Sequence, residues 1–375
     1  MKSVPPLPIE DLEHILRHTI TLWEEARGKS FFITGGTGFF GMWLLESFIH
    51  CNDSLNLGAT ATVLSRDPSA FSEKAPHLAR RSDLTFIKGD IRDFQFPKQK
   101  YDYLLHAATE ASAKLNREAP YEMLDSIIAG MRRVLDFSKS AKVNKFLFTS
   151  SGAVYGQQPS DLTHVPEDHY GSPDCLSPSS AYGEGKRVAE LMAAIHSGLH
   201  GTEVKIARCF AFVGPHLPLD GEFAIGNFLR DAMAGDDISI KGDGTPHRSY
   251  LYAADLAIWL WTILFKGESL RPYNVGSEEN HSISQFAAIV NQSLGTDSPI
   301  EIARPANTTN SVLRYAPSTL RARNELGLAP MISLENAIKR TAFWHRHSKC
   351  GLGESDSTQT TPEQNAPSQR IDENP

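Results

Sequence analysis

Short apolar runs alternate with longer segments of helical periodicity along the chain, as far as residue 210. Apolar residues at helical spacing predict an amphipathic N-terminal helix over 9–26. The predicted strands cover 30–34, 61–64, 84–87, 103–105 and 145–149, and helices are predicted at 40–50 and 123–139. Strands that alternate with helices at this spacing are typical of right-handed βαβ units. The pattern therefore predicts an α/β fold, built on a parallel sheet with helices on both faces.

The pattern changes after about residue 210, where glycine and proline become more frequent and the strands become shorter. Two further helices are predicted at 284–294 and 333–345. The predicted parts are an N-terminal helical extension (1–28), a first lobe (29–210), a smaller C-terminal lobe interleaved with it (211–347) and a tail (350–375). The tail has no aromatic residue and almost no aliphatic one. It cannot repay its ordering entropy, so we predict that it is disordered.

Composition and charge narrow the class of function. Of the 375 residues, 41% are apolar and 22% are charged, so a large core can form in one large domain or two modest ones. Lys and Arg number 37 against 44 Asp and Glu, which gives a net charge of −7. A nucleic-acid-binding protein normally shows a basic excess, so no nucleic-acid partner is predicted. A few local Arg or Lys residues can still hold an anionic small substrate.

Cysteine usage and the longest apolar stretch bear on the compartment. Cys51, Cys175, Cys209 and Cys350 lie far apart, without a CxxC pair or a histidine at metal-ligand spacing. This argues against a disulfide framework and a metal site, and it fits a reducing compartment. The most apolar later stretch, 257–265, is shorter than the ~20 residues that span a bilayer, and the N-terminus lacks the apolar run of a signal peptide. We therefore expect a soluble, cytoplasmic protein without membrane contact.

A glycine-rich turn follows the first predicted strand. The segment FFITGGTGFFGMWLLESF runs from that strand through Gly35, Gly38 and Gly41 into a helix. This spacing lets the backbone turn tightly, approach a pyrophosphate at the helix N-terminus and pack the helix against the strand. With a strand before it and a helix after it, the turn predicts a Rossmann-type lobe for a nicotinamide dinucleotide. Phe39 and Phe40, within the turn, belong to the predicted cofactor site.

The end of the second predicted strand bears on the choice between NAD and NADP. An acidic side chain there would hydrogen-bond the ribose 2′-OH of NAD, whereas Arg accommodates the 2′-phosphate of NADP. The strand ends in Ser65 and Arg66, which favours NADP(H), while Asp67 one position later is the alternative that would hold the ribose of NAD. Four more residues complete the predicted cofactor site: Asp90 and Ile91 beside the adenine, and Ala107 and Ala108 under the diphosphate.

Ser151, Tyr182 and Lys186 form the second strong signal. Tyr182 and Lys186 are four residues apart on a predicted helix and share one face, although such a pair alone also occurs as a surface pair. A phenol with a pKa near 10 is a poor base unless a nearby positive charge favours the phenolate. Lys186 and the charge of an oxidised nicotinamide would supply that field, so both residues also contact the cofactor. Ser151 ends a central strand, where it would hydrogen-bond the substrate oxygen whose proton Tyr182 takes.

Together these motifs resemble the extended short-chain dehydrogenases/reductases of the nucleotide-sugar epimerase/dehydratase family. The resemblance runs from Lys29 to about Arg346, through TGGTGFFG, GDIRD, LHAA, TSSGAVYG, YGEGK, ARCFAFVGP, GDGTPHRSYLYAADLA, YNVGS and LGLAPMISLENAIKRT. It implies a Rossmann lobe for NAD(P), a small C-terminal lobe for a nucleoside-diphosphate sugar, a homodimer formed through a helix pair, and a role in carbohydrate biosynthesis. It also implies that Arg248 grips the diphosphate and that Asn227 lies near the nucleotide.

Departures from the family's pattern narrow the reaction. Dehydratases of the family carry an Asp-Glu pair after the Ser/Thr and decarboxylases keep the Glu, whereas this chain has Gly152 and Ala153, which cannot exchange protons. Ser65 replaces the usual acid for NAD, and Ala211 replaces a usual Asn. We predict an epimerase that transiently oxidises C4 of a nucleoside-diphosphate hexose; the alternative is an NADPH-dependent reductase of a 4-keto-6-deoxy nucleotide sugar. A 4,6-dehydratase, a decarboxylase and a non-catalytic nucleotide-binding relative are less favoured, the last because all three catalytic residues are present.

Overall fold

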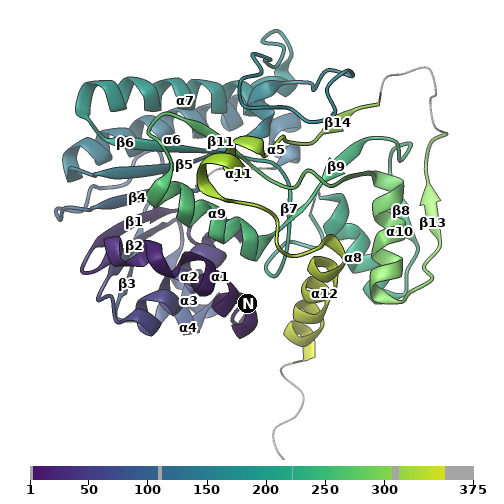
Figure 1. The fold of residues 1–375 in the computed structure, drawn as a ribbon, viewed down its shortest axis with the longest axis horizontal. Coiled ribbons are helices and arrows are strands. Elements are labelled where there is room, and N and C mark those ends of the chain that lie inside the picture. Colours follow the sequence, from purple (N-terminus) through teal and green to yellow (C-terminus); the bar gives the residue numbers. More distant parts are fainter. Residues whose placement is uncertain (1–2, 109–111, 222, 306–311, 351–375) are drawn as a thin grey trace, which may run out of the picture.

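A seven-stranded parallel sheet forms the centre of the computed structural model, which describes residues 3–108, 112–221, 223–305 and 312–350 (Figure 1). The strand order is β11-β6-β5-β4-β1-β2-β3. These strands are β1 (Ser30–Thr34), β2 (Thr60–Ser65), β3 (Leu84–Lys88), β4 (Tyr103–His106), β5 (Lys145–Ser151), β6 (Glu203–Cys209) and β11 (Pro272–Val275). All five predicted strands are confirmed, and the order reverses at β1 and β4, so the site is expected at their carboxyl ends.

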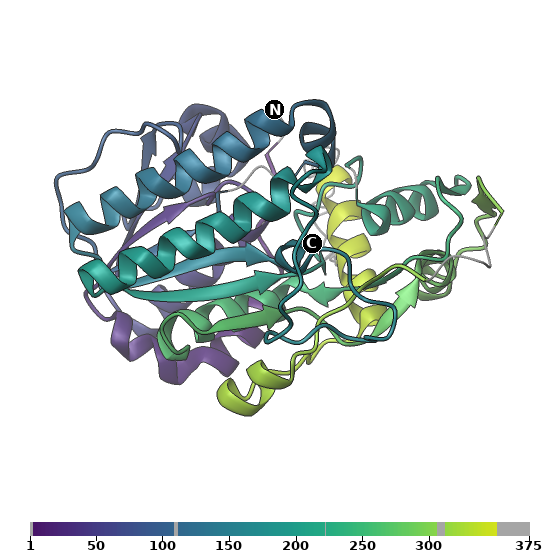
Figure 2. The same cartoon turned by 90° about the horizontal axis from the view of Figure 1, so that it is seen from above.

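Helices cover both faces of the sheet, as predicted. One face carries α2 (Phe39–Leu55), α9 (Ala253–Lys266) and α1 (Ile9–Thr19), and the other carries α6 (Pro120–Ala141) and α7 (Ala181–His200), which lie side by side in Figure 2. Neighbouring residues of β1 point to opposite faces: Phe31 packs with Trp261, and Phe32 packs with Phe137. Side chains of β1 therefore contribute to the cores on both faces of the sheet.

The most apolar stretch of the chain lies within α9. Every residue from Ala253 to Phe265 is buried, which suits a helix that is apolar on all sides and enclosed by protein. Among the described residues, no helix combines the length and the apolar character that crossing a membrane would require.

The predicted N-terminal helix over 9–26 is only partly confirmed. The α-helix α1 ends at Thr19, and the segment Ile20–Ala26 continues as a 3₁₀-helix. The break occurs where Thr19 has φ −120°, and its hydroxyl bonds the carbonyl of Ile15 while accepting the indole N–H of Trp23 at 2.9 Å. The helix docks through the buried Asp11, which accepts the Tyr252 hydroxyl at 2.6 Å and pairs with Arg340.

The elements after residue 210 add three small sheets beside the central one (Figures 1 and 2). Their strands are β7 (Phe212–Val213) with β10 (Leu251–Tyr252), β9 (His247–Ser249) with β12 (Asn280–Ser282) and β14 (Arg314–Tyr315), and β8 (Ile238–Ile240) with β13 (Ile300–Ile302). The helices here are α8 (Ala224–Ala234), α10 (Ile283–Leu294), α11 (Leu320–Leu326) and α12 (Leu334–Cys350), so both predicted late helices are confirmed. The predicted disordered tail, apart from Cys350, lies outside the described residues.

The remaining elements are short. They are α3 (Pro68–Lys74), α4 (Pro76–Ala79), α5 (Ala113–Glu118) and the 3₁₀ turns η2 (Gly152–Tyr155) and η3 (Pro178–Ser180). Two of them follow strands of the central sheet directly: η2 continues from β5, and α3 begins just beyond β2.

Candidate active site

The glycine turn between β1 and α2 has the shape that a pyrophosphate needs. A Cβ at Gly35, where φ is +74°, would lie 2.4 Å from the backbone of Ala107, and a Cβ at Gly41 would lie 2.2 Å from the carbonyl oxygen of Gly35. These two glycines are therefore required by the packing of the chain itself. Gly38 differs, because a Cβ there would meet nothing closer than 3.5 Å. Gly38 also begins a helix of 17 residues that no side chain caps, so the space and N–H groups fit a dinucleotide pyrophosphate.

Three residues at the tip of β2 are candidates for contacting the ribose of the cofactor. Ser65 is buried, and its hydroxyl accepts the N–H of Asp67 at 3.3 Å. The carboxylate of Asp67 caps α3 by accepting the N–H of Ala70 at 3.0 Å. Arg66 is exposed, and its charge helps to lower the pKa of Asp90. The capping role of Asp67 leaves Arg66 as the more suitable partner for a ribose substituent.

The other predicted cofactor residues lie along the same edge of the sheet. Asp90, just beyond β3, accepts the Arg92 guanidinium at 2.8 Å, and this hydrogen bond is the main cause of its lowered pKa. Ile91 packs against α6, where a Cβ on Gly130 would lie 3.1 Å from it. The N–H of Ala108 lies 3.3 Å from the Thr34 hydroxyl, which fixes the backbone beyond β4 against β1.

A cleft of about 650 Å³ joins the glycine turn to the predicted catalytic residues. It is lined by these predicted residues: Gly35, Gly38, Phe39, Phe40, Ala107, Ser151, Tyr182, Lys186 and Arg248. Its lining does not include the following predicted residues: Gly41, Ser65, Arg66, Asp90, Ile91, Ala108 and Asn227. Asn227 lies on α8, where the oxygen of its side-chain amide accepts a hydrogen bond from the guanidinium of Arg230 at 3.2 Å. The prediction that Asn227 lies near the nucleotide thus has no support in this lining.

Lys186 and Tyr182 lie together on α7, but their electrostatics differ from the expectation. Lys186 donates to the carbonyl oxygen of Thr149 at 2.8 Å, and its ammonium is 5.9 Å from the centroid of the Tyr182 ring. Burial lowers the pKa of Lys186 to about 8. Burial also raises the pKa of Tyr182, while a hydrogen bond with Ser151 lowers it. In the protein alone, burial raises the pKa of Tyr182 by more than the expected effect of Lys186 lowers it. Ser151 is the group that favours the phenolate.

Asn116, on α5, is a site residue that the sequence analysis missed. The oxygen of its side-chain amide accepts the backbone N–H of Tyr182 at 3.0 Å, and the NH₂ group of the same amide donates to the backbone carbonyl of Ser179 at 2.8 Å. Ser180, the N-cap residue of α7, makes no capping hydrogen bond with its own side chain. Asn116 therefore caps α7 from another helix, and it lines the cleft as well.

Tyr315 and Tyr250 also line the cleft without having been predicted. The Tyr315 hydroxyl is 3.5 Å from the Ser151 hydroxyl, and its ring packs on Phe210 with centroids 4.7 Å apart. Burial raises the pKa of Tyr250 to about 12, so this phenol stays neutral. Tyr250 lies within the motif GDGTPHRSYLYAADLA but was not assigned to the site, and Tyr315 lies in none of the quoted motifs. Both reach the cleft from short strands and loops after residue 210.

The charged groups of the cleft bear on its chemistry. Among the described residues that line it there is no Asp or Glu, and the charged side chains are those of Lys186 and Arg248. Glu190 is not part of this lining: it accepts the Ser150 hydroxyl at 2.5 Å and two N–H groups of the Arg208 guanidinium. A Cβ on Gly152 would lie 2.6 Å from the Phe210 ring, so a larger side chain at position 152 would require that ring to move.

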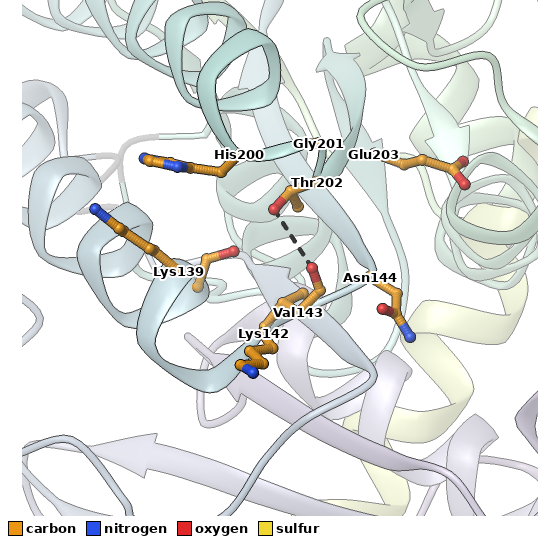
Figure 3. Close-up of a pocket in the computed structure, with 9 residues that line it drawn as sticks. Lys139, Lys142, Val143, Asn144, His200, Gly201, Thr202 and Glu203 are labelled. Carbon is orange, nitrogen blue, oxygen red and sulfur yellow. Dashed lines mark hydrogen bonds between the residues drawn. The ribbon is translucent and has the colours of Figure 1, made fainter.

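A second hollow, of about 560 Å³, lies at the opposite ends of the strands (Figure 3). Lys139, Lys142 and His200 lie around it, and the Thr202 hydroxyl donates to the carbonyl of Val143 at 3.4 Å. These residues adjoin the amino ends of β5 and β6, whereas ligands of open α/β sheets bind at the carboxyl ends. None of the predicted catalytic residues lines this hollow.

Comparison with known proteins identifies the family. Residues 31–276 match the profile of the NAD dependent epimerase/dehydratase family. The chain belongs to this family. It is 27% identical to UDP-glucuronic acid decarboxylase 1 of Xenopus tropicalis, over 85% of this chain and 72% of that protein. It is 28% identical to UDP-glucuronic acid decarboxylase 1 of Arabidopsis thaliana, over 82% of this chain and 68% of that protein.

Solved structures of family members share the fold. An epimerase from Methanothermobacter thermautotrophicus superposes with a TM-score of 0.74 at 24% identity, covering 89% of this chain and 97% of that one. A UDP-glucuronic acid 4-epimerase from Bacillus cereus, in complex with UDP-glucuronic acid and NAD, gives a TM-score of 0.72 at 20% identity over 85% of this chain and 99% of that one. The predicted parallel sheet and family resemblance are thus confirmed.

Proposed function

We propose that this protein is an NAD(P)-dependent epimerase that acts by transient oxidation at C4 of a nucleoside-diphosphate hexose. One observation carries the proposal: Ser151, Tyr182 and Lys186 line the same cleft as the glycine turn, and no carboxylate is found among the described residues of its lining. The names of related solved structures, among them a UDP-glucose 4-epimerase and a UDP-glucuronic acid 4-epimerase, support this substrate class.

The residues divide the chemistry as follows. Tyr182 takes the proton of the C4 hydroxyl and returns it at the end of the reaction, while Ser151 holds the reacting oxygen by a hydrogen bond. Lys186, fixed by the Thr149 carbonyl, holds the ribose of the cofactor. A bound nicotinamide supplies the acceptor and donor for the hydride. Arg248 lines the same cleft and offers a guanidinium to the diphosphate of the substrate.

Decarboxylation and dehydration fit this cleft less well, although the curated relatives named above are decarboxylases. Both reactions need an acid or base beyond the tyrosine. The residues that follow Ser151 are Gly152 and Ala153, and neither carries a group that exchanges protons. Incubation with UDP-glucuronic acid tests this argument directly, because release of carbon dioxide by the wild-type protein would contradict it.

The second candidate is an NADPH-dependent reductase of a 4-keto-6-deoxy nucleotide sugar. The tip of β2 supports it, because Asp67 caps α3 while Arg66 is exposed at the same tip. Cofactor stoichiometry separates the two candidates. An epimerase interconverts UDP-hexoses with catalytic amounts of cofactor, whereas a reductase consumes one NADPH for each keto sugar. Mass spectrometry of copurified ligands would identify the cofactor and nucleotide together.

The proposed enzyme acts as a homodimer that associates through α7. Leu191, Ile195 and Leu199 are 61%, 54% and 72% exposed and recur every fourth residue on one face of this helix. The opposite face is buried in the core at Ala189 and Ala193. An apolar stripe on solvent is typical of an interaction surface, and a second copy of the same stripe is its simplest partner.

A further inference from the structure

Three hydrogen-bonding groups meet at the Ser151 hydroxyl. Its oxygen accepts the backbone N–H of Ala153 at 3.1 Å, and it lies 3.5 Å from the hydroxyl oxygen of Tyr315. Hydrogen bonding by Ser151 also lowers the pKa of Tyr182. Two phenols therefore share one serine hydroxyl, and only one of them is the expected base.

Counting donors and acceptors shows how the two phenols differ. A serine hydroxyl donates one proton and accepts two hydrogen bonds. The Ala153 N–H occupies one acceptor position. If Tyr315 donates into the second, the single Ser151 proton is directed to the oxygen of Tyr182. If Tyr315 accepted that proton instead, Tyr182 would lose the hydrogen bond that favours its phenolate.

We propose that Tyr315 is a positioning residue that donates to Ser151 and thereby directs the Ser151 proton to Tyr182 until the bound substrate oxygen replaces Tyr182 as the acceptor of that proton. This favours the phenolate of Tyr182, which must take the proton of the substrate. The inference rests on the proposed function only in treating Tyr182 as the base.

The surroundings of Tyr315 hold it in place as a donor. Its ring packs on Phe210 on one side and lies 5.8 Å from the Arg248 guanidinium, its register partner on β9. The next residue along the chain, Ala316, is held from both sides: its N–H donates to Gln158 at 3.0 Å and its carbonyl accepts from Val165 at 2.9 Å. Burial raises the pKa of Tyr315 well above its usual range, so the phenol keeps its proton.

The other titratable groups at this corner are Lys186 on α7, Cys209 at the end of β6 and Arg248 on β9. Burial raises the pKa of Cys209 to about 12, so its thiol stays neutral. Burial lowers the pKa of Lys186 to about 8, so its charge changes within the working range. All Tyr315 variants must therefore keep Lys186, so that its change of charge contributes equally to each titration.

The test measures the ionisation of Tyr182 without any substrate. Ultraviolet absorbance of tyrosinate is followed against pH for the complex with cofactor, and the same titration of Tyr182→Phe is subtracted as a blank. Tyr315→Phe should raise the pKa of Tyr182 by on the order of one unit, the size expected for weakening a hydrogen bond to a charged group. In a Ser151→Ala background the same change should have no effect, because the connecting hydroxyl is gone.

Steady-state kinetics give a second readout. In a plot of kcat/KM against pH, the rising limb should move to higher pH in Tyr315→Phe. KM should stay close to the wild-type value. Tyr250→Phe is the matched control, because it removes a phenol near Arg248 from the same cleft and should leave the limb in place. A raised KM with an unchanged pKa of Tyr182 would show that Tyr315 contacts the substrate, and the proposal would be wrong. If no nucleotide hexose is turned over, the proposed function fails, while the titration still decides the role of Tyr315.

Discussion

At the scale of the residue, desolvation is the main obstacle to the chemistry that Tyr182 is expected to perform. Burial raises its pKa, and the same burial lowers the pKa of Lys186 to about 8. The sequence predicted the residues but not this balance, because desolvation depends on how completely the surrounding helices and strands enclose them. A positive charge brought by an oxidised cofactor would add to the Ser151 hydrogen bond in favouring the phenolate.

Tyr182→Phe tests the base directly. The variant keeps the ring and loses only the hydroxyl, so it should fold, melt at the wild-type temperature and bind cofactor with unchanged Kd. Turnover should fall at least ~100-fold, the range expected when a positioned acid/base is lost. The measurement is kcat on the interconversion of UDP-hexoses. Near-normal turnover would remove Tyr182 from the mechanism.

Arg66→Ala tests the choice of cofactor. An arginine at the tip of β2 can pair with the 2′-phosphate of NADP, and a charge-assisted contact of about 1.5–3 kcal/mol corresponds to a preference of roughly ten- to a hundred-fold. The substitution should erase the preference for NADP without changing the Kd of NAD. Ser65→Asp should invert the preference, because its carboxylate repels the phosphate and accepts from the ribose hydroxyls. Equal Kd values for NAD and NADP in the wild-type protein would contradict the role of Arg66.

At the scale of the element, local patterns were sufficient for the sheet and for the glycine turn. The five predicted strands and the turn at Gly35 are confirmed because each depends on consecutive residues and their immediate neighbours. Asn116 and Tyr315 were missed because tertiary contacts bring them to the site. Asn116 meets Tyr182 across a separation of 66 residues, and Tyr315 meets Ser151 across 164. The change to a 3₁₀-helix after Thr19 was missed because it depends on the backbone at one residue.

Asn116→Leu tests whether the start of α7 needs a cap from α5. Leucine cannot accept the N–H of Tyr182 or donate to the carbonyl of Ser179, so the first turn should loosen. Loss of a cap costs about 1 kcal/mol of stability, which predicts a lower melting temperature. Asn116→Asp keeps the acceptor and should recover most of the loss. If both variants behave alike, the capping oxygen is not what matters at this position.

At the scale of the whole molecule, the cleft brings together parts that are far apart in the sequence. Gly35 and Ser151 come from loops and strands of the central sheet, whereas Arg248 and Tyr315 come from the small sheet β12-β9-β14. The N-terminal helix α1 joins this assembly through Asp11, which accepts the hydroxyl of Tyr252 on β10. The position of the candidate site is therefore a property of the assembled chain, even though local sequence motifs predict its proposed catalytic residues.

The last prediction concerns association through α7. Ile195→Lys places a charge in the centre of the stripe formed by Leu191, Ile195 and Leu199, where burial of an unpaired ammonium would be costly. Sedimentation should give about twice the chain mass of 41.4 kDa for the wild-type protein and the mass of a single chain for the variant. Phe343→Lys is the matched control, because Phe343 is 61% exposed, close to the 54% of Ile195, but lies on α12. It should leave the dimer intact. A wild-type protein that sediments as a monomer, or a control that dissociates equally, would show that the stripe on α7 is not the interface.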